Sequence, residues 1–429
     1  MTARTQQEIE QKRVLAPPPG GTQLCPEGRF MNRQGTLRSI SLQSPMRANT
    51  EVAGVRVRIV LVQTQAEGAG AQEISRILGG GLEARGHDVH HVFLYRRTSI
   101  YDDQPNTFFC ARERPRGILS FARMVRALMS QLRRLQPEVV VCFQHYGNLI
   151  GTIAARLGNV NTVIANRTTS KQLTPPVACW LEHLFGVMGL FDRIVVNCGT
   201  IANEYQGRYG RYRARVVRID HGFEPKFSHL DRAAARALFN LPADATLLGS
   251  VGRLHPGKNL AAAVAMLKLE PQWCLALAGQ GPAREGLTAL VASLGVEDRV
   301  YFLGELPPDR VGAFLRTLDV FVFPSLAETF GLAAVEAAQA GLPIVANTLD
   351  VLHEVLAFEG RPCALFVDAA DTANFAGAIR RLLMEDDLRE ALTSSGKRLS
   401  ERYSLGAMVQ KYASLIEELA PSCAGCVRK

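Results

Sequence analysis

The chain of 429 residues is too long for one domain of ordinary size, so we expect two domains of about 150 to 200 residues each, together with short tails. Its 47% hydrophobic and 21% charged residues are typical of a soluble globular protein, and no run approaches the roughly 18 apolar residues that a membrane span needs. The opening "MTARTQQEIEQKR" lacks the apolar core of a secretory signal, and nine scattered cysteines without an export signal indicate reduced thiols, so we expect a cytoplasmic protein.

The net charge of +9 is concentrated near the start of the chain, where residues 1–60 hold nine Arg and Lys against four Glu. Up to about Thr50 this stretch is also rich in Pro, Gly and Ser, so we expect residues 1–50 to be a disordered or irregular extension without catalytic groups. Residues 421–429 are predicted to be a tail. Its Cys423 and Cys426 form a single C-x-x-C pair, which cannot close a tetrahedral metal site.

In residues 51–228 short β-rich runs alternate with helical segments, which predicts a doubly wound parallel sheet. The predicted strands are "VRVRIVLV", "HDVHHVFLY", "PEVVVCFQ", "VNTVIAN", "DRIVVN" and "RARVVRI". The helix predicted over 71–85 contains Gly79, Gly80 and Gly81, which cost about 1 kcal/mol each relative to Ala. We favour close packing against the sheet over a binding role for these three glycines.

The loop "TQAEGAGAQEI" follows the first strand and precedes that helix. Gly68 and Gly70 allow the backbone to approach a ligand at a distance where a Cβ would clash. Main-chain N–H groups at a helix N-terminus bind phosphate well. The loop therefore predicts a phosphate contact in the first domain.

The segment "RGILSFARMVRALMSQLRRL" predicts an amphipathic helix with a basic face. Arg123, Arg126, Arg133 and Arg134 share one side, opposite an apolar side made by Phe121, Met124, Val125, Leu128, Leu132 and Leu135. Further along, "YQGRYGRYRARVVR" adds arginines with interleaved tyrosines. Contact with an anionic membrane surface and plain solvation explain both segments equally well, and both interpretations stay open.

The alternation of strands and helices restarts after residue 229. The strands predicted in residues 229–403 are "TLLGSVG", "WCLALAG", "RVYFLG", "DVFVFP", "LPIVAN" and "CALFV". A helix over 405–419, within a segment 404–420, is expected to pack back toward the first domain. The predicted fold class is therefore α/β, with two Rossmann-like doubly wound parallel-sheet domains facing across a cleft that is the default ligand site.

Two cations follow the first strand of the second domain, in "GRLHPGKNLAAAVAML". Arg253 and Lys258 precede a helix that is predicted to begin near Asn259, a plausible N-cap. A cation beside a helix N-terminus opposes the helix dipole by about 0.3 to 1 kcal/mol. An anion bound there removes the conflict, and a diphosphate is the natural candidate.

Other cofactor signals are missing from the sequence. The loop "AGQGPAREG" has a G-x-G without the further Gly of a dinucleotide fingerprint, which disfavours a nicotinamide enzyme. Neither a P-loop nor a pair of Asp at metal-binding spacing after a strand is found. We therefore expect no cofactor and no metal.

Two carboxylates border the apolar stretch "SLAETFGLAAVEAAQAGLPIVA". Glu328 is predicted to lie in a loop after a strand, and Glu336 lies about one and a half turns into the following helix. A carboxylate among Ala, Val and Leu needs a specific partner, and one that faces a vicinal diol accepts two strong hydrogen bonds. We therefore expect Glu336 to bind a ribose, Glu328 to bind a second ring, and Phe330 to Leu332 to supply main-chain donors.

The motif "SLAETFGLAAVE", with its two Glu around an F-G, together with "VGRLHPGKN", resembles the retaining nucleotide-sugar glycosyltransferases of family 4, which have the GT-B fold. The resemblance covers about residues 56–419 and is strongest over 247–347. It implies a front-face transfer with retention, in which the leaving diphosphate takes the proton of the acceptor. It also implies a hexosyltransferase that uses a UDP- or GDP-linked sugar.

The resemblance implies roles for particular residues. Those of the second domain are Arg253 and Lys258 as diphosphate ligands, Glu336 as the ribose ligand, Glu328 with the backbone of Phe330 and Gly331 as donor-sugar contacts, and Leu303 beside the base. In the first domain Gly70 matches the glycine that approaches the phosphate, and His145 matches a histidine that faces the donor sugar.

This sequence departs from the family pattern at three places. After "PIVAN" the usual Gly-Gly is missing and only Glu354 of that motif remains. The first loop reads "EGAGAQE" where Gly-Gly-Ala-Glu is commoner, and His221 replaces a usual Asn. These departures leave the identity of the donor open.

The function that we expect is transfer of a sugar to a glycan or lipid-linked acceptor in cell-surface polysaccharide or glycolipid synthesis, in the cytoplasm or on the inner face of its membrane. Two enzymes of the same fold remain as alternatives, a nucleotide-sugar epimerase and a sugar phosphorylase. A basic non-catalytic binding protein is the alternative from another class. Nucleic acid is not an expected partner, because +5 of the net charge of +9 lies in residues 1–60 and no nucleic-acid module is visible.

Overall fold

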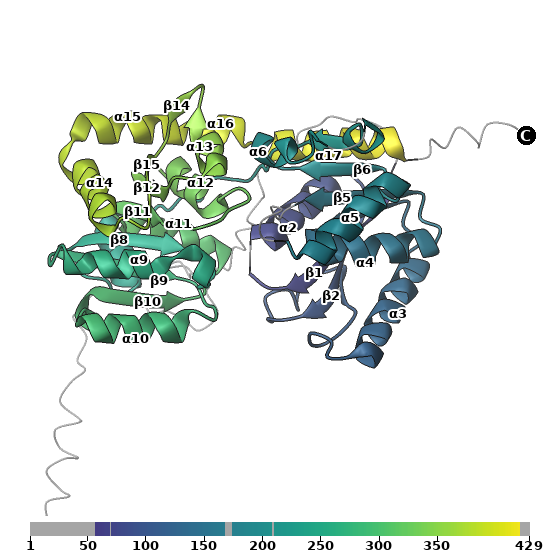
Figure 1. The fold of residues 1–429 in the computed structure, drawn as a ribbon, viewed down its shortest axis with the longest axis horizontal. Coiled ribbons are helices and arrows are strands. Elements are labelled where there is room, and N and C mark those ends of the chain that lie inside the picture. Colours follow the sequence, from purple (N-terminus) through teal and green to yellow (C-terminus); the bar gives the residue numbers. More distant parts are fainter. Residues whose placement is uncertain (1–55, 69, 168–173, 208–209, 421–429) are drawn as a thin grey trace, which may run out of the picture. The chain divides into compact units, whose positions relative to one another are not determined.

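The computed structural model describes residues 56–68, 70–167, 174–207 and 210–420. The predicted extension over 1–50 and the tail with Cys423 and Cys426 lie outside these ranges. Within them the chain forms two parallel sheets covered by helices, one in each half, so the predicted fold class is confirmed (Figure 1). No helix in the described ranges combines the length and the apolar character that crossing a bilayer requires.

The first sheet has seven strands in the order β3-β2-β1-β4-β5-β6-β7, and all its described neighbours are parallel. The strands are β1 (Arg58–Ala66), β2 (Asp88–Arg96), β3 (Thr107–Phe109), β4 (Val139–Phe143), β5 (Thr162–Arg167), β6 (Arg193–Val196) and β7 (Val216–Arg218). The central strands β1, β4 and β5 are buried on both faces, which explains their continuous apolar runs. The sequence predicted every strand except β3, whose three residues are too few for a periodic signal.

Helices cover both faces of this sheet. They are α2 (Gly70–Glu83), α3 (Ile118–Leu135), α4 (Gln144–Leu157), α5 (Pro176–Met188), α6 (Gly199–Asn203) and α7 (Gly210–Arg213). The chain steps across the sheet in one direction from β3 through β4 and β5 to β6, and in the other direction from β1 to β2. Right-handed crossovers then put α3, α4 and α5 on one face and α2 on the other, and α4 packs between α3 and α5 (Figure 1).

Helix α4 packs very closely on the sheet because two glycines face it. A Cβ on Gly151 would lie 2.6 Å from Sγ of Cys142. The N–H of Gly147 donates to Oγ1 of Thr64 at 3.1 Å. This close packing fixes the N-terminus of α4, and with it His145, at the carboxyl ends of β1 and β4.

The second sheet has six strands in the order β10-β9-β8-β11-β12-β15, again with parallel neighbours. The strands are β8 (Thr246–Val251), β9 (Trp273–Ala278), β10 (Val300–Gly304), β11 (Val320–Phe323), β12 (Ile344–Asn347) and β15 (Leu365–Val367). All six were predicted. A short antiparallel pair, β13 (Ala357–Phe358) with β14 (Arg361–Pro362), was not predicted, because each strand has only two residues.

The second sheet is also flanked by helices. They are α8 (Arg232–Leu238), α9 (Leu260–Ala265), α10 (Arg284–Leu294), α11 (Pro308–Thr317), α12 (Leu332–Gln339), α13 (Asp350–Val355), α14 (Thr372–Met384), α15 (Asp386–Lys397) and α16 (Leu399–Arg402). Three 3-10 turns accompany them at Pro256–Lys258, Met266–Lys268 and Glu297–Arg299.

The last helix, α17 (Leu405–Leu419), returns to the first half of the chain. Its Tyr412 hydroxyl contacts the side-chain amide of Asn166 in β5, and the carbonyl of Leu419 accepts from Oγ1 of Thr162 at 3.0 Å. It also packs along α2. The C-terminal helix is therefore attached to the first sheet.

The contact between α2 and α17 explains part of the glycine triplet. A Cβ on Gly81 would lie 2.4 Å from Cγ2 of Val409 in α17. A Cβ on Gly79 would lie 2.5 Å from Nε2 of His91 in β2, whereas a Cβ on Gly80 would meet nothing within 4 Å. The preferred interpretation, close packing, holds for Gly79 against the sheet. For Gly81 the neighbour is a helix, and Gly80 has no packing reason.

Candidate functional site

A small pocket lies at the carboxyl end of β8. It is lined by Ser250, Val251, Gly252, Arg253, Lys258, Leu260, Ala278, Phe323 and Ser325. Both cations that the sequence singled out are among these residues. The hydroxyl of Ser325 is buried and has no hydrogen-bond partner among the described residues. The pocket therefore offers two positive charges and an unused hydroxyl in one place.

Lys258 reaches across the pocket to the loop after β11. Its Nζ lies 2.5 Å from Oε1 of Glu328 and 5.2 Å from the centre of the Phe323 ring. The sequence placed these two charged residues in one site, and the structure joins them as an ion pair. Lys258 was expected to bind a diphosphate, whereas in this structure its charge is balanced by the carboxylate of Glu328.

Helix α9 begins at Leu260, so Asn259 occupies the predicted N-cap position. Its side chain makes no capping hydrogen bond, and its backbone is left-handed with φ of 49°. A 3-10 turn over Pro256–Lys258 precedes it, in which the ring Nδ1 of His255 accepts from the N–H of Gly257. The capping role predicted for the Asn259 side chain is therefore wrong, because the tight turn before α9 holds this residue in a conformation unlike that of an N-cap.

Arg253 is paired with a residue that the sequence analysis missed. Its Nη1 lies 3.2 Å from Oε1 of Glu67, whose other oxygen lies 2.9 Å from Nη1 of Arg97. Glu67 is 7% exposed, so a nearly buried carboxylate sits between two arginines. The signal was present, because Glu67 is the first residue after β1, at the carboxyl end of a central strand.

The glycine loop of the first half lies against the second half. A Cβ on Gly70 would come within 2.6 Å of Cδ1 of Leu332, at the start of α12. A Cβ on Gly68 would come within 2.1 Å of Oε1 of Glu305, which follows β10. The structure thus brings the N-terminus of α2, with Gly70, to the N-terminus of α12, with Leu332.

Glu336 occupies α12 as the sequence predicted, one turn beyond the helix start. Its side chain is partly buried, and burial raises the pKa of its carboxyl to about 7, while Lys226 opposes this rise and Glu73 adds to it. No hydrogen bond reaches this carboxyl from the described residues. Glu73 itself pairs with Arg76 at 2.8 Å and lies 3.8 Å from Nζ of Lys226. Glu336 therefore has unused acceptor capacity.

The turn before α12 is built around Gly331, which has φ of 84° and acts as the N-cap position of the helix. Its neighbour Phe330 is 2% exposed and packs edge-on against His221 and Tyr403, with ring centres 5.0 and 5.1 Å apart. The ring of Phe330 is therefore a core side chain. Only the backbone of Phe330 and Gly331 is available for the ligand contact that was predicted.

His145 stands in the first turn of α4, directly after β4. Its Nδ1 has no partner among the described residues, and its ring lies 4.2 Å from that of Tyr146. Burial lowers the pKa of His145, and the charge of Arg167 lowers it further, so the ring is neutral at pH 7. The preceding Gln144 has a backbone φ of 64°, which is rare for a residue other than Gly.

Leu303 lies in β10 and is partly buried. It is followed by Gly304, with φ of 73°, whose carbonyl accepts from the N–H of Gly279 at 2.6 Å. Neither Leu303 nor His145 is joined to Arg253, Lys258 or Glu336 by an interaction that the described residues show. Leu303 and His145 thus lie near the carboxyl ends of β10 and β4, but no described contact joins them to the other predicted site residues.

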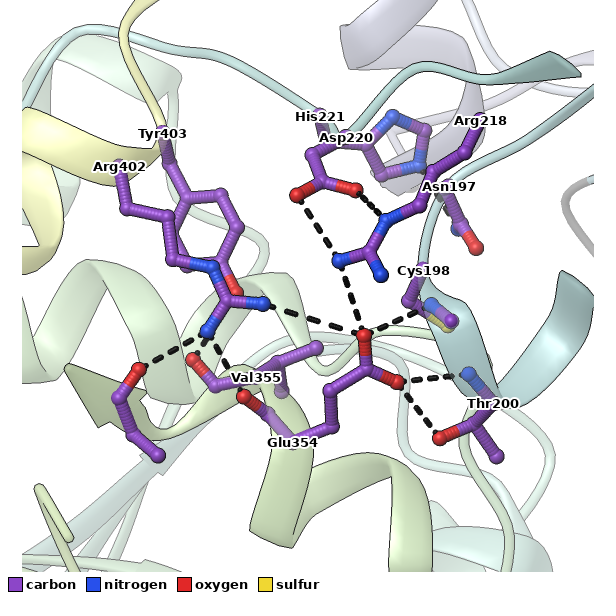
Figure 2. A network of polar contacts seen from close by, with 12 residues as sticks. Asn197, Cys198, Thr200, Arg218, Asp220, His221, Glu354, Val355, Arg402 and Tyr403 are labelled. Carbon is purple, nitrogen blue, oxygen red and sulfur yellow. Dashed lines mark hydrogen bonds and ion pairs between the residues drawn. The ribbon is translucent and has the colours of Figure 1, made fainter. Parts of the chain in front are cut away.

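Glu354 is the one residue of the usual family motif after β12 that this chain keeps. It belongs to a polar network that joins the two halves (Figure 2). Its carboxylate accepts from the N–H groups of Gly199 at 2.7 Å and Thr200 at 2.6 Å, from Oγ1 of Thr200 at 2.7 Å, and pairs with Arg218 at 2.9 Å. Burial would raise the pKa of Glu354, but the bonds from Thr200 and Gly199 and the charge of Arg218 outweigh it and lower the pKa. Glu354 in α13 thus holds the N-terminus of α6.

His221, which stands where the family usually has Asn, lies beside this network. Burial lowers its pKa to about 4, although the charge of Asp220 opposes the shift. Its Nε2 lies 3.0 Å from Nδ2 of Asn197. A neutral, enclosed ring in this place packs on Phe330 and is a structural side chain. Among the described residues no group of three or more His, Cys, Asp and Glu could hold a metal ion.

Comparison with known families decides which class of protein has this arrangement. The family described as Glycosyltransferase Family 4 matches residues 69–227, and the family described as Glycosyl transferases group 1 matches residues 231–399. The two matches meet at the change from the first sheet to the second. The chain belongs to the family 4 glycosyltransferases.

Curated relatives of this glycosyltransferase share part of their length with it. A "D-inositol 3-phosphate glycosyltransferase" of Acidothermus cellulolyticus is 37% identical over 212 residues, which cover 46% of this chain and 47% of the relative. One of Rhodococcus jostii is 32% identical over 225 residues, which cover 50% of this chain and 49% of the relative. The matched part thus spans about half the length of these relatives.

Solved structures match more of the chain. HepE of Anabaena, solved "in complex with UDP and glucose", has a TM-score of 0.73 at 17% identity and covers 85% of this chain and 100% of its own. Sucrose-phosphate synthase from Thermosynechococcus elongatus has a TM-score of 0.72 at 22% identity and covers 85% of this chain and 99% of its own. At such identities the likeness shows the fold, which is GT-B.

Proposed function

We propose that this glycosyltransferase moves a hexose, with retention, from a nucleotide-diphosphate sugar to a glycan or lipid-linked acceptor. The observation that carries the proposal is the pocket at the end of β8, where Arg253 and Lys258 meet beside the loop that leads to Glu336. Two cations suit a diphosphate, and a carboxylate with unused acceptors suits a ribose diol.

The donor is proposed to be UDP- or GDP-linked. HepE, which shares the fold, was solved with UDP and with UDP-glucose, and this supports a uridine donor. In this assignment Leu303 lies beside the base, and Glu328 and the backbone of Phe330 and Gly331 contact the sugar. Gly70 leaves room for the phosphates, and His145 faces the sugar from the first half.

Transfer is proposed to proceed on one face of the sugar. As the glycosidic bond of the donor breaks, negative charge grows on the leaving diphosphate, where Arg253 and Lys258 stabilise it. The diphosphate oxygen then takes the proton of the attacking acceptor hydroxyl. Each cation first has to exchange its carboxylate partner, Glu67 or Glu328, for a phosphate oxygen. Two fixed cations supply the positive charge of the site, so we propose that the reaction needs no metal or cofactor.

The proposed acceptor implies a place of action. A glycan or lipid-linked acceptor is built at the inner face of the cytoplasmic membrane when its donor is a cytoplasmic nucleotide sugar. We therefore propose a role in cell-surface polysaccharide or glycolipid synthesis at that face.

A thermal-shift panel of nucleotide sugars tests the donor site. A ligand at 100 times its dissociation constant adds about 2.7 kcal/mol to the free energy of unfolding. We expect a UDP- or GDP-sugar to raise the melting temperature of the wild type and to have no effect on Glu336→Ala. The effect should be larger at pH 8 than at pH 6, because a carboxyl with a pKa of about 7 is mostly protonated at pH 6 and loses one acceptor.

Glu285→Gln, an exposed change on α10, is the control and should keep the shift. Full stabilisation of Glu336→Ala by the same sugar would remove the ribose assignment. Product analysis with the active donor then separates transfer from its alternatives, since an epimerase leaves the nucleotide attached and a phosphorylase uses phosphate as the acceptor.

A further inference from the structure

The outer face of α5 is apolar and exposed. Its exposed side chains are Val177 (69%), Trp180 (62%), Val187 (50%) and Met188 (63%). Their spacing puts them on one side of the helix. The one carboxylate of α5, Glu182, is buried and pairs with Arg167. The exposed side of α5 therefore presents no charge to solvent.

Helix α4 continues this apolar face. Tyr146 (41%), Ile153 (44%) and Leu157 (62%) are exposed and recur at intervals of seven and four residues, again on one side of the helix. Because α4 and α5 pack against each other on the same face of the first sheet, their exposed sides adjoin (Figure 1). We call these seven side chains the α4–α5 surface.

Arginines border the α4–α5 surface on both sides. Helix α3, which packs on α4, exposes Arg123, Arg126, Arg133 and Arg134, and α7, which packs on α5, exposes Arg211 and Arg213. Within the described residues of these four helices the buried Glu182 is the only carboxylate. An apolar centre is thus bordered by positive charge that no acidic side chain of the same helices offsets.

A second copy of the chain is a poor occupant for this surface. A twofold interface would place the same patch on itself and bring the arginine border against arginines. Like charges that face each other without carboxylates cost several kcal/mol of association free energy. A protein partner would need an acidic border, whereas a bilayer of anionic lipids supplies both the apolar interior and the negative headgroups.

We propose that the α4–α5 surface docks on an anionic membrane. Trp180 and its apolar neighbours enter the interface between headgroups and acyl chains, and the arginines of α3 and α7 lie over the headgroups. Trp and Tyr suit such a boundary because one end of each ring is apolar and the other is polar. None of the seven side chains of the α4–α5 surface lines the donor pocket of β8, so docking leaves that pocket free.

Vesicle sedimentation of the full chain, without donor or acceptor, tests this surface independently of sugar transfer. The probes are vesicles of equal parts phosphatidylglycerol and phosphatidylcholine, and vesicles of phosphatidylcholine alone. We expect binding to the anionic vesicles, weakened by salt. Trp180→Asp should lower this binding by about tenfold or more, since it replaces the largest inserting side chain with a charge. The double change Arg123→Ala and Arg126→Ala should lower it by about 25-fold at low salt, about fivefold for each arginine.

Matched changes in the second half are the controls. Leu269→Asp replaces an exposed apolar residue (50%), and Arg310→Ala with Arg316→Ala removes two exposed arginines of α11. Both should bind like the wild type, and the thermal shift with UDP should be equal in all variants. The proposal is overturned if the wild type ignores anionic vesicles or if Trp180→Asp binds as well as Leu269→Asp. Gel filtration that shows a dimer broken by Trp180→Asp would also overturn it, in favour of a second copy.

Discussion

The two cations of the donor pocket are not free in the unliganded protein. Lys258 is held by Glu328, and Arg253 is held by Glu67, which also binds Arg97. Each of these carboxylates competes with a phosphate group of the ligand for the cation with which it pairs. The affinity of the site for a diphosphate is therefore the difference between two charge-assisted contacts.

Glu67→Gln removes this competition. Arg253 is 42% exposed in its side chain, so its pair with Glu67 is screened and worth at most about 1 kcal/mol. We expect the variant to bind UDP up to about fivefold more tightly, measured by titration calorimetry. Glu285→Gln should leave the dissociation constant unchanged. Weaker binding by Glu67→Gln would mean that Glu67 helps to form the phosphate site and does not compete with it.

At the level of helices and strands, the glycines of α2 offer a matched test of packing. Gly80 has open space around its Cα, whereas a Cβ on Gly81 would lie 2.4 Å from Val409 of α17. Gly80→Ala should raise the free energy of unfolding by up to about 1 kcal/mol, the difference in helix propensity. Gly81→Ala should lower it by about 1 to 3 kcal/mol, because the methyl group overpacks the contact. Urea denaturation measures both; equal stability of the two variants would show that α17 does not press on α2.

Particular residues show which features of the fold and the site the sequence could predict and which it could not. Strands such as β4 and β11 carry continuous apolar runs, so local pattern was sufficient to predict them. It was also sufficient to place Arg253, Lys258 and Glu328 in the loops after β8 and β11, and Glu336 in the helix that follows β11. The neighbour of Gly81 could not be predicted, because Val409 is far along the chain and helix pairing leaves no local trace. The position of Glu67 directly after β1 was visible in the sequence, but its pairing was not, because its partners Arg97 and Arg253 lie in the loops after β2 and β8.

At the scale of the whole chain, the two halves are joined by polar contacts that no periodicity predicts. Glu354 and Thr200 are separated by 154 residues in the sequence, yet the carboxylate of Glu354 accepts from the backbone and the hydroxyl of Thr200. Arg218 and Arg402 add positive charge to the same carboxylate from either side (Figure 2). One side chain of the second half thus fixes the start of α6 and the end of β7 in the first.

Removing this carboxylate should destabilise the protein in a pH-dependent way. Glu354→Gln keeps the shape of the side chain but loses the charge that its donors favour, so we expect the free energy of unfolding at pH 7 to fall by about 1 to 3 kcal/mol. The folded-state pKa of Glu354 lies below its ordinary value of 4.5, so its contribution is present above pH 4.5 and is lost as the pH falls through the folded-state pKa. The difference between wild type and variant in urea denaturation should therefore shrink between pH 7 and pH 3.5. Glu385→Gln, which removes an exposed pair with Arg381, is the control and should match the wild type at pH 7. A loss for Glu354→Gln that is the same at both pH values would mean that the hydrogen-bonding shape of the side chain, and not its charge, joins the two halves.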